Sequence, residues 1–134
     1  MHWMHHMSSK IFLIALLLLT MPASLGRAQA SIDPDEDFRQ AIEFFETEQF
    51  LESRRILERL TETHPTRALY WFNLANSDYM LEDYANALRG YQKAIELRSP
   101  LSPPARLYAA RAHRKIGDHT SAVRELNLLQ GKSC

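Results

Sequence analysis

Cysteine is almost absent from this chain of 134 residues, and its one cysteine, Cys134, is the last residue. A single thiol cannot form a disulfide within the chain, so the fold must be held together by packing. Cys134 is left as a free thiol on a terminal tail or as half of a disulfide to another chain. Glycine is also scarce, with four residues, and no glycine-rich phosphate-binding sequence occurs.

An excess of charge of either sign is missing as well. Sixteen Lys and Arg residues balance sixteen Asp and Glu residues, so the formal net charge is zero. Without an overall positive field the chain has no general attraction for the phosphate backbone, and we expect no nucleic-acid binding. Hydrophobic residues make up 46% and charged residues 24% of the sequence. These proportions are typical of a globular chain, and the length allows one domain.

Common catalytic and metal-binding motifs are also lacking. The sequence contains no HExxH pattern, and its only thiol is terminal. After residue 30 the histidines are His64, His113 and His119, and their separation does not match the spacing of zinc ligands. We therefore predict that the protein is not an enzyme and that it needs no metal or cofactor.

The longest apolar run is short. It covers Ile11–Met21, which is eleven residues and contains one threonine. A membrane-spanning helix needs about 20 residues, whereas the central segment of a secretory signal needs only about 7–15. Lys10 precedes the run, and Ala28 and Ala30 form the small-x-small pattern that signal peptidase accepts. The pattern predicts a signal that is cleaved after Ala30.

Cleavage there would leave residues 31–134 as an exported protein. We expect it in the periplasm or the cell envelope, with secretion into the medium as the alternative. An uncleaved N-terminal anchor is a further alternative, and that segment would then be the only part in contact with a membrane.

The sequence after residue 30 is repetitive. A shift of 34 residues aligns Ala41 with Ala75, and a shift of 35 aligns Ala75 with Ala110 and Ala87 with Ala122. The additional residue falls in a proline-containing loop, 99–104, where an insertion costs little. A fixed period of this length is typical of solenoid proteins.

Turn signals divide each period into two helices. Asp33 and Asp83 are predicted N-caps, and Gly117 and Gly131 are predicted C-terminal caps. The predicted helices cover residues 34–46, 50–63, 66–81, 83–97, 102–116 and 118–130. The sequence therefore predicts an all-α fold of three helical hairpins.

The second period resembles the tetratricopeptide-repeat (TPR) family. Its residues 71–97 read WFNLANSDYMLEDYANALRGYQKAIEL, which follows the signature of small and aromatic positions in that family. The signature positions are filled by Trp71, Leu74, Ala75, Tyr84, Ala87, Tyr91 and Ala94. The first and third periods depart from it, with Ser53 in place of a packing alanine, Arg106 in place of the tryptophan and His113 in place of an aromatic residue. The resemblance implies a right-handed TPR solenoid with repeats at about 34–65, 66–100 and 102–131.

The resemblance also implies a concave groove lined by the first helix of each repeat, where TPR proteins commonly bind a peptide or a partner helix. Repeat one would contribute Phe38, Ile42 and Phe45; repeat two Phe72, Asn73, Asn76, Tyr79 and Met80; and repeat three Leu107, Arg111, Arg114 and Lys115. Such a groove is apolar at one end and basic at the other. It suits a partner protein with hydrophobic anchors followed by an acidic segment or a free carboxylate. In the alternative interpretation, the asparagines serve helix packing and the cations are merely solvated.

Two functions are compatible with this pattern. The first is a non-catalytic adaptor or scaffold that holds a partner segment in the groove. The second is a structural or oligomerisation module of an envelope complex. The last helix places Ala122, Val123, Leu126 and Leu129 on one stripe and polar residues elsewhere. We expect from this pattern an end that caps itself, which favours the adaptor.

Overall fold

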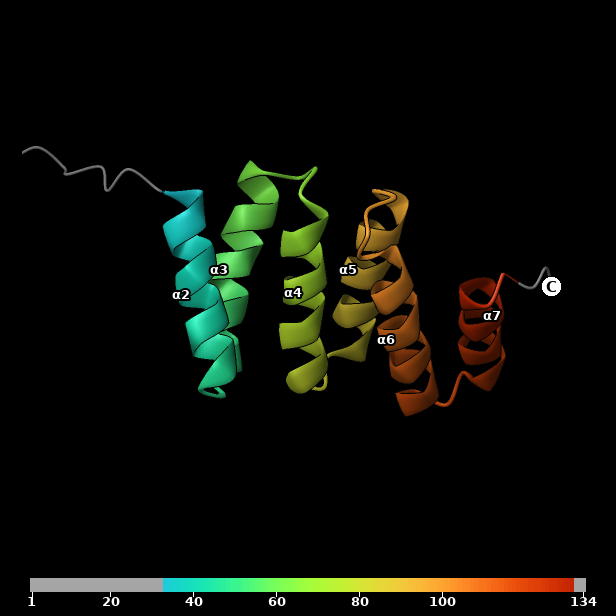
Figure 1. Ribbon diagram of the computed structural model, residues 1–134. Coiled ribbons are helices and arrows are strands. Elements are labelled where there is room, and N and C mark those ends of the chain that lie inside the picture. The colour runs from blue at the N-terminus through green and yellow to red at the C-terminus, as the bar shows by residue number, and fades with distance from the viewer. Residues whose placement is uncertain (1–32, 132–134) are drawn as a thin grey trace, which may run out of the picture. The chain divides into compact units, whose positions relative to one another are not determined.

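The computed structural model describes residues 33–131, and these residues form six α-helices in succession (Figure 1). The helices are α2 (Pro34–Glu46), α3 (Phe50–Thr63), α4 (Ala68–Met80), α5 (Tyr84–Glu96), α6 (Ser102–Lys115) and α7 (His119–Leu129). The predicted signal segment with Ala28 and Ala30, and the terminal Cys134, lie outside the described residues.

The helices form three consecutive hairpins. Helix α2 packs on α3, α4 on α5 and α6 on α7, while α3 also packs on α4 and α5 on α6 (Figure 1). The predicted all-α solenoid of three hairpins is therefore confirmed. The predicted helix ends are correct within two residues. The largest difference is at α4, which begins at Ala68 because Thr66 lies in a turn and Arg67 takes an extended, non-helical conformation at the N-cap.

Three aspartates begin helices in the same way. The side chain of Asp33 accepts a hydrogen bond from the backbone N–H of Asp35, that of Asp83 from Asn86, and that of Asp118 from Ser121. Each bond satisfies one of the N–H groups that lack a partner in the first turn of a helix. Asp83 and Asp118 occupy equivalent places in repeats two and three, whereas Gln49 at this place in repeat one makes no side-chain cap bond.

A left-handed residue follows the first helix of every repeat. Gly117 fills this position after α6 with φ of 82°, but Glu48 and Glu82 fill it after α2 and α4 with φ of 61° and 62°. A side chain with a Cβ is strained in this conformation, whereas glycine is not. The connection after α4 therefore follows the geometry of the array and not the preference of its own residue.

Helices α4 and α5 approach each other closely at Gly90. A Cβ atom built on Gly90 would lie 2.8 Å from the Cβ of Ala75 and 3.1 Å from the carbonyl oxygen of Trp71. The sequence pattern predicted small residues at Ala75 and Ala87, and both are fully buried. It did not single out Gly90, where an added Cβ has no room.

The buried residues form two clusters, and each cluster crosses a boundary between repeats. The first joins Leu57 and Leu60 of α3 to Tyr70 and Leu74 of α4. The second joins residues of α5, including Tyr91, to small residues of α6, including Ala105 and Ala109. Because the repeats share their cores, neighbouring repeats stabilise one another.

Candidate protein-interaction surface

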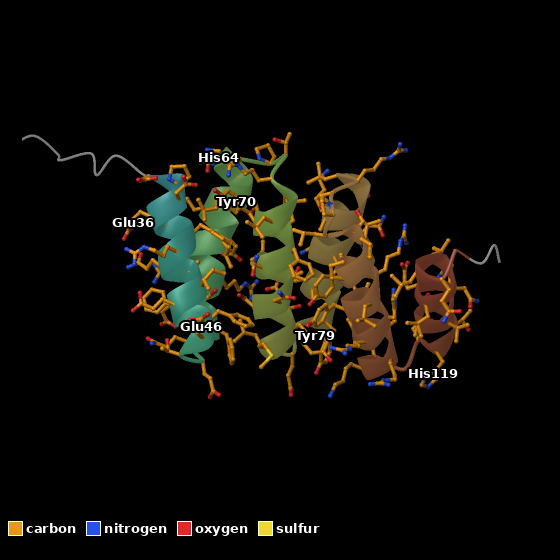
Figure 2. The ribbon with its side chains drawn as sticks, viewed as in Figure 1. Glu36, Glu46, His64, Tyr70, Tyr79 and His119 are labelled. Carbon is orange, nitrogen blue, oxygen red and sulfur yellow. The ribbon has the colours of Figure 1, made fainter. Side chains whose placement is uncertain are left out.

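The twelve predicted groove residues all lie on α2, α4 and α6, the first helices of the three repeats. Met80, Arg111, Arg114 and Lys115 are exposed, whereas the other eight are half-buried. Tyr79 lies near the end of α4 and Tyr70 near its beginning (Figure 2). The predicted site is therefore a strip along the first helices, and its fully accessible part is toward α6.

The apolar residues of α2 are partly used by the fold. The ring of Phe38 packs against Tyr70 of α4 with centroids 5.2 Å apart. Phe45 meets the edge of Phe50 at the start of α3, also at 5.2 Å. These contacts leave only part of each ring available to a partner.

The amides in the middle of the strip also have structural contacts. Tyr91 is fully buried, and its hydroxyl donates a hydrogen bond of 2.9 Å to Asn76 Oδ1. Burial raises the pKa of Tyr91, so this phenol stays protonated and needs an acceptor. Asn73 Nδ2 donates to the carbonyl oxygen of Leu69 in its own helix at 2.8 Å. Asn76 thus serves packing, as the alternative interpretation held, while the Oδ1 atom of Asn73 is not used in that bond.

Tyr108 is a surface residue that the sequence analysis missed. Its ring stacks on Tyr91 with centroids 5.9 Å apart, and it meets the edge of Phe72 at 5.8 Å. The guanidinium of Arg111 lies over the other part of the ring, 4.9 Å from its centroid. The repeat shift pairs Tyr108 with Asn73, so the family pattern gave no reason to expect an aromatic residue here. Its position three residues before Arg111 on one helix was the available signal.

The basic part of the strip lies in the second half of α6. Among residues 33–131 no carboxylate lies within ion-pair distance of Arg111, Arg114 or Lys115. Arg111 and Arg114 line a cleft of about 260 Å³ between α6 and α7. The other residues of this cleft are Leu107, Ala110, Ala122 and Leu126. The cleft therefore combines an apolar floor with two cations.

A separate ionic cluster lies at the boundary between repeats one and two. Arg54 Nε of α3 lies 3.2 Å from Oδ1 of the buried Asp78 in α4, and 2.9 Å from Glu58 Oε1. Burial raises the pKa of Asp78 to about 6, and the attraction of Arg54 offsets only part of this rise. Nearby, Ser53 and Ser77 share a buried hydrogen bond of 3.1 Å. The serine in place of the packing alanine is thus explained by a hydroxyl partner on the next helix.

The equivalent position in repeat three holds His113, and it does not pair with Asp78. His113 Nδ1 lies 3.4 Å from Asp118 Oδ2, the carboxylate that caps α7. A pair between Asp78 and His113, which their equivalent places in adjacent repeats suggest, does not form because each has a closer partner within its own surroundings.

Residues 33–131 contain neither a candidate metal site nor a candidate membrane span. No group of three or more His, Cys, Asp or Glu side chains in residues 33–131 is arranged to hold a metal ion. Among the helices α2 to α7, none is long and apolar enough to cross a membrane.

The fold and the exposed first-helix strip define a class of protein, the solenoid of helical hairpins. The family model described as tetratricopeptide repeat matches residues 68–99, which correspond to repeat two. The resemblance predicted from Trp71, Ala75 and Ala87 is therefore confirmed, and the chain contains a tetratricopeptide repeat flanked on each side by a hairpin of the same fold. No curated protein sequence matches the chain.

Solved structures of TPR proteins have the same arrangement of helices. The CopN-Scc3 complex matches with 23% identity and a TM-score of 0.69, over 72% of this chain and 56% of that chain. MamA from Desulfovibrio magneticus RS-1 matches with 16% identity and a TM-score of 0.71, over 75% of this chain and 56% of that one. The N-terminal domain of stress-induced protein-1 from C. elegans matches with 17% identity and a TM-score of 0.68, over 73% and 82%. The chain thus spans little more than half the length of the first two.

Proposed function

We propose that the protein is a non-catalytic scaffold that holds a segment of a partner protein along the first helices of its repeats. The observation that carries this proposal is the strip on α6, where Arg111, Arg114 and Lys115 are exposed beside the aromatic surface of Tyr108 and Phe72. Arginine and aromatic residues are both enriched at protein interfaces. The structural neighbours support a role in protein assembly, since one of them is a complex of CopN with Scc3.

The chemistry of the strip defines the segment that fits it. Tyr108 and Phe72 offer apolar contact area, and Met80 adds an adaptable side chain that is 47% exposed. The cations of α6 then favour an acidic stretch or a terminal carboxylate that follows the apolar anchors. The partner is therefore an extended or helical segment with apolar residues followed by negative charge.

The site of action is part of the same proposal. Lys10, the apolar run Ile11–Met21 and the Ala28–Ala30 pattern support export to the periplasm or cell envelope, with secretion as the alternative. If the N-terminal segment is not cleaved, the same scaffold would be held at a membrane.

The decisive experiment measures how two kinds of substitution in this protein change its affinity for one partner. The partner is recovered from the native host with the tagged protein, and its affinity is then measured at low and high salt. We expect the double substitution Arg111→Ala and Arg114→Ala to weaken binding at low salt by roughly three- to tenfold and to flatten the salt dependence. Phe72→Ala should weaken binding equally at both salt concentrations because its contribution is burial.

Two controls make the comparison interpretable. Arg55→Ala removes an exposed cation from α3, outside the strip, and should leave affinity and salt dependence unchanged. Thermal unfolding must be measured for Phe72→Ala because this ring also packs on Tyr91. If the double arginine variant folds and binds with unaltered affinity and salt dependence, the strip on α6 is not the binding surface.

One observation favours the second function, a structural module. The predicted self-capped end is wrong, because Val123, Leu126, Leu128 and Leu129 of α7 are all exposed. An apolar end of this kind is suited to contact with a further element.

A further inference from the structure

Two side chains of α7 are exposed at positions where the equivalent side chains of the other repeats are buried. Position by position, Leu126 of α7 corresponds to Tyr91 of α5 and Leu57 of α3. The side chains of Leu57 and Tyr91 are 0% exposed, whereas Leu126 is 39% exposed. The next stacking position repeats the pattern, since Leu60 and Ala94 are 0% exposed and Leu129 is 37% exposed.

The cause of this difference is the helix that follows. In repeats one and two, these positions are covered by the first helix of the next repeat, through Tyr70 and Leu74 of α4 and through Ala105 and Ala109 of α6. Within residues 33–131 no helix covers α7 in this way. The cleft of about 260 Å³ lined by Leu107 and Leu126 lies between α6 and α7 on the face where such a helix would pack.

At the opposite end of the array, α2 has polar residues at the positions that are buried in α4. The positions of α2 that correspond to the buried Tyr70, Leu74 and Ser77 of α4 are Glu36, Gln40 and Glu43, and all three are exposed. Figure 2 shows Glu36 on the side of α2 that faces away from the other helices. A second copy stacked head to tail would bury two carboxylates against Leu126 and Leu129, which is unfavourable unless each is paired.

A second copy placed tail to tail is disfavoured by charge. Arg111 and Arg114 line the cleft, and two acidic side chains at this end of the array already have partners, Glu125 with Arg106 at 2.8 Å and Asp118 with His113 at 3.4 Å. Two such ends would bring like charges together, whereas a negatively charged element would be attracted.

We infer that the end of the array formed by α6 and α7 is a second docking site, for an amphipathic helix of a partner protein. The helix takes the place that a fourth first helix would occupy. One ridge of it carries small or apolar residues that cover Leu126 and Leu129, and one flank carries Asp or Glu residues that meet Arg111 and Arg114. The site shares Arg111 and Arg114 with the proposed groove, but its apolar part, the exposed Leu126 and Leu129 of α7, is separate from it.

The test uses a helix that already fits an equivalent face. The probe is a synthetic peptide of residues 102–116, the segment that covers α5, with Arg106→Glu, Arg111→Glu and Arg114→Glu to supply the acidic flank. The peptide is titrated to millimolar concentration into the isotopically labelled protein, and backbone amide shifts are followed by NMR. We expect saturable shifts at α7 and the second half of α6.

Two variants of the protein and one of the probe make the result specific. Leu126→Glu should weaken probe binding by at least about tenfold, because it places a carboxylate where apolar area is buried. Leu128→Glu is the matched control on the same helix, because its equivalents Arg59 and Lys93 are exposed, and it should change the affinity by less than about twofold. A probe with Gln in place of the three Glu residues should bind more weakly and without salt dependence.

Several outcomes would overturn the inference. The first is the absence of shifts on α7 at millimolar probe; the second is shifts confined to α2 and α4, which would assign helix binding to the groove. Equal binding of the Gln probe would refute the acidic flank. A concentration-dependent dimer in sedimentation equilibrium that Leu126→Glu abolishes would replace the partner helix by a second copy of the chain. Both protein variants are checked for unchanged thermal unfolding.

Discussion

Asp78 carries a carboxylate into the boundary between repeats one and two, where its side chain is almost fully buried. Water is removed from the charge, and Arg54 at 3.2 Å does not fully replace it. The result is a pKa of about 6 in place of the ordinary 3.8. The charged form of this residue therefore weakens the native state near neutral pH.

The sign of the effect on stability follows from this rise. The folded protein holds the proton of Asp78 more tightly than the unfolded chain, so the contribution is fully present below pH of about 4. It is lost as pH rises through about 6. Between pH 5 and 7, we expect Asp78 to lower the unfolding free energy of the wild type by on the order of 1 kcal/mol. The variant Asp78→Asn should not show this decrease.

Urea unfolding at several pH values measures this difference. Glu62→Gln, which replaces an exposed carboxylate of α3, is the matched control and should retain the wild-type slope. Identical slopes for the wild type and Asp78→Asn between pH 5 and 7 would contradict the assignment of a raised pKa to Asp78.

The backbone conformation and the side-chain partners of some single residues could not be predicted from the sequence. The glycine at the end of α6 was predictable because Gly117 is suited to positive φ, but Glu48 and Glu82 adopt the same conformation without a sequence signal. Asp78 and His113 occupy equivalent places in adjacent repeats, yet they contact different partners, Arg54 and Asp118. Such pairings depend on side-chain directions across helices, which a repeat shift does not contain.

At the scale of elements, the packing of α4 on α5 depends on the absence of a side chain at Gly90. A Cβ there would lie 2.8 Å from the Cβ of Ala75, so one helix would have to move. Glycine to alanine in an exposed helix stabilises by about 1 kcal/mol, whereas overpacking costs about 1–3 kcal/mol. We expect Gly90→Ala to lower the melting temperature because the contact is made to an atom fixed on the backbone of α4.

The reverse substitution at an exposed site separates the two effects. Ala85→Gly on the same helix measures the helix propensity alone, since Ala85 is exposed. A melting temperature for Gly90→Ala equal to or above that of the wild type would mean that α4 and α5 can separate at no cost.

The ends of the array show why some elements were predicted better than others. Helix positions follow from caps and period, and these are local in sequence. The sequence predicted an α7 that caps the array, but Leu126 and Leu129 are exposed. The equivalent positions in repeats one and two are buried by the helix that follows. The stripe itself does not tell whether such a helix is present.

For the whole molecule, the period of 34 residues was sufficient to predict three hairpins, and the residues of repeat two were sufficient to predict the tetratricopeptide-repeat model that matches residues 68–99. The surface was predicted less completely. Carrying the family geometry over selected residues that lie on the first helices, among them Asn76, which accepts a bond from Tyr91 as the packing interpretation held. It also omitted Tyr108, because neither of the other repeats has an aromatic residue at the equivalent position.

Export is a prediction about the whole chain. If the segment of residues 1–30 is a signal, the protein recovered from its host begins at Ser31, because signal peptidase cuts after the small-x-small pattern. N-terminal sequencing of the recovered protein measures this directly. Recovery of the protein in the membrane fraction with the segment of residues 11–30 still attached would instead indicate an anchored scaffold.

The central claim, that a partner lies along the first helices, is tested most directly by photo-crosslinking in the native host. A photoreactive amino acid replaces Met80, which is 47% exposed on α4, or Leu51, which is 55% exposed on the second helix α3. Both sites are exposed, but only Met80 belongs to the strip on the first helices. The account predicts a discrete crosslinked product at position 80 whose yield falls in the Arg111→Ala and Arg114→Ala background, and none at position 51. No product at position 80, or the same product at both positions, would contradict it.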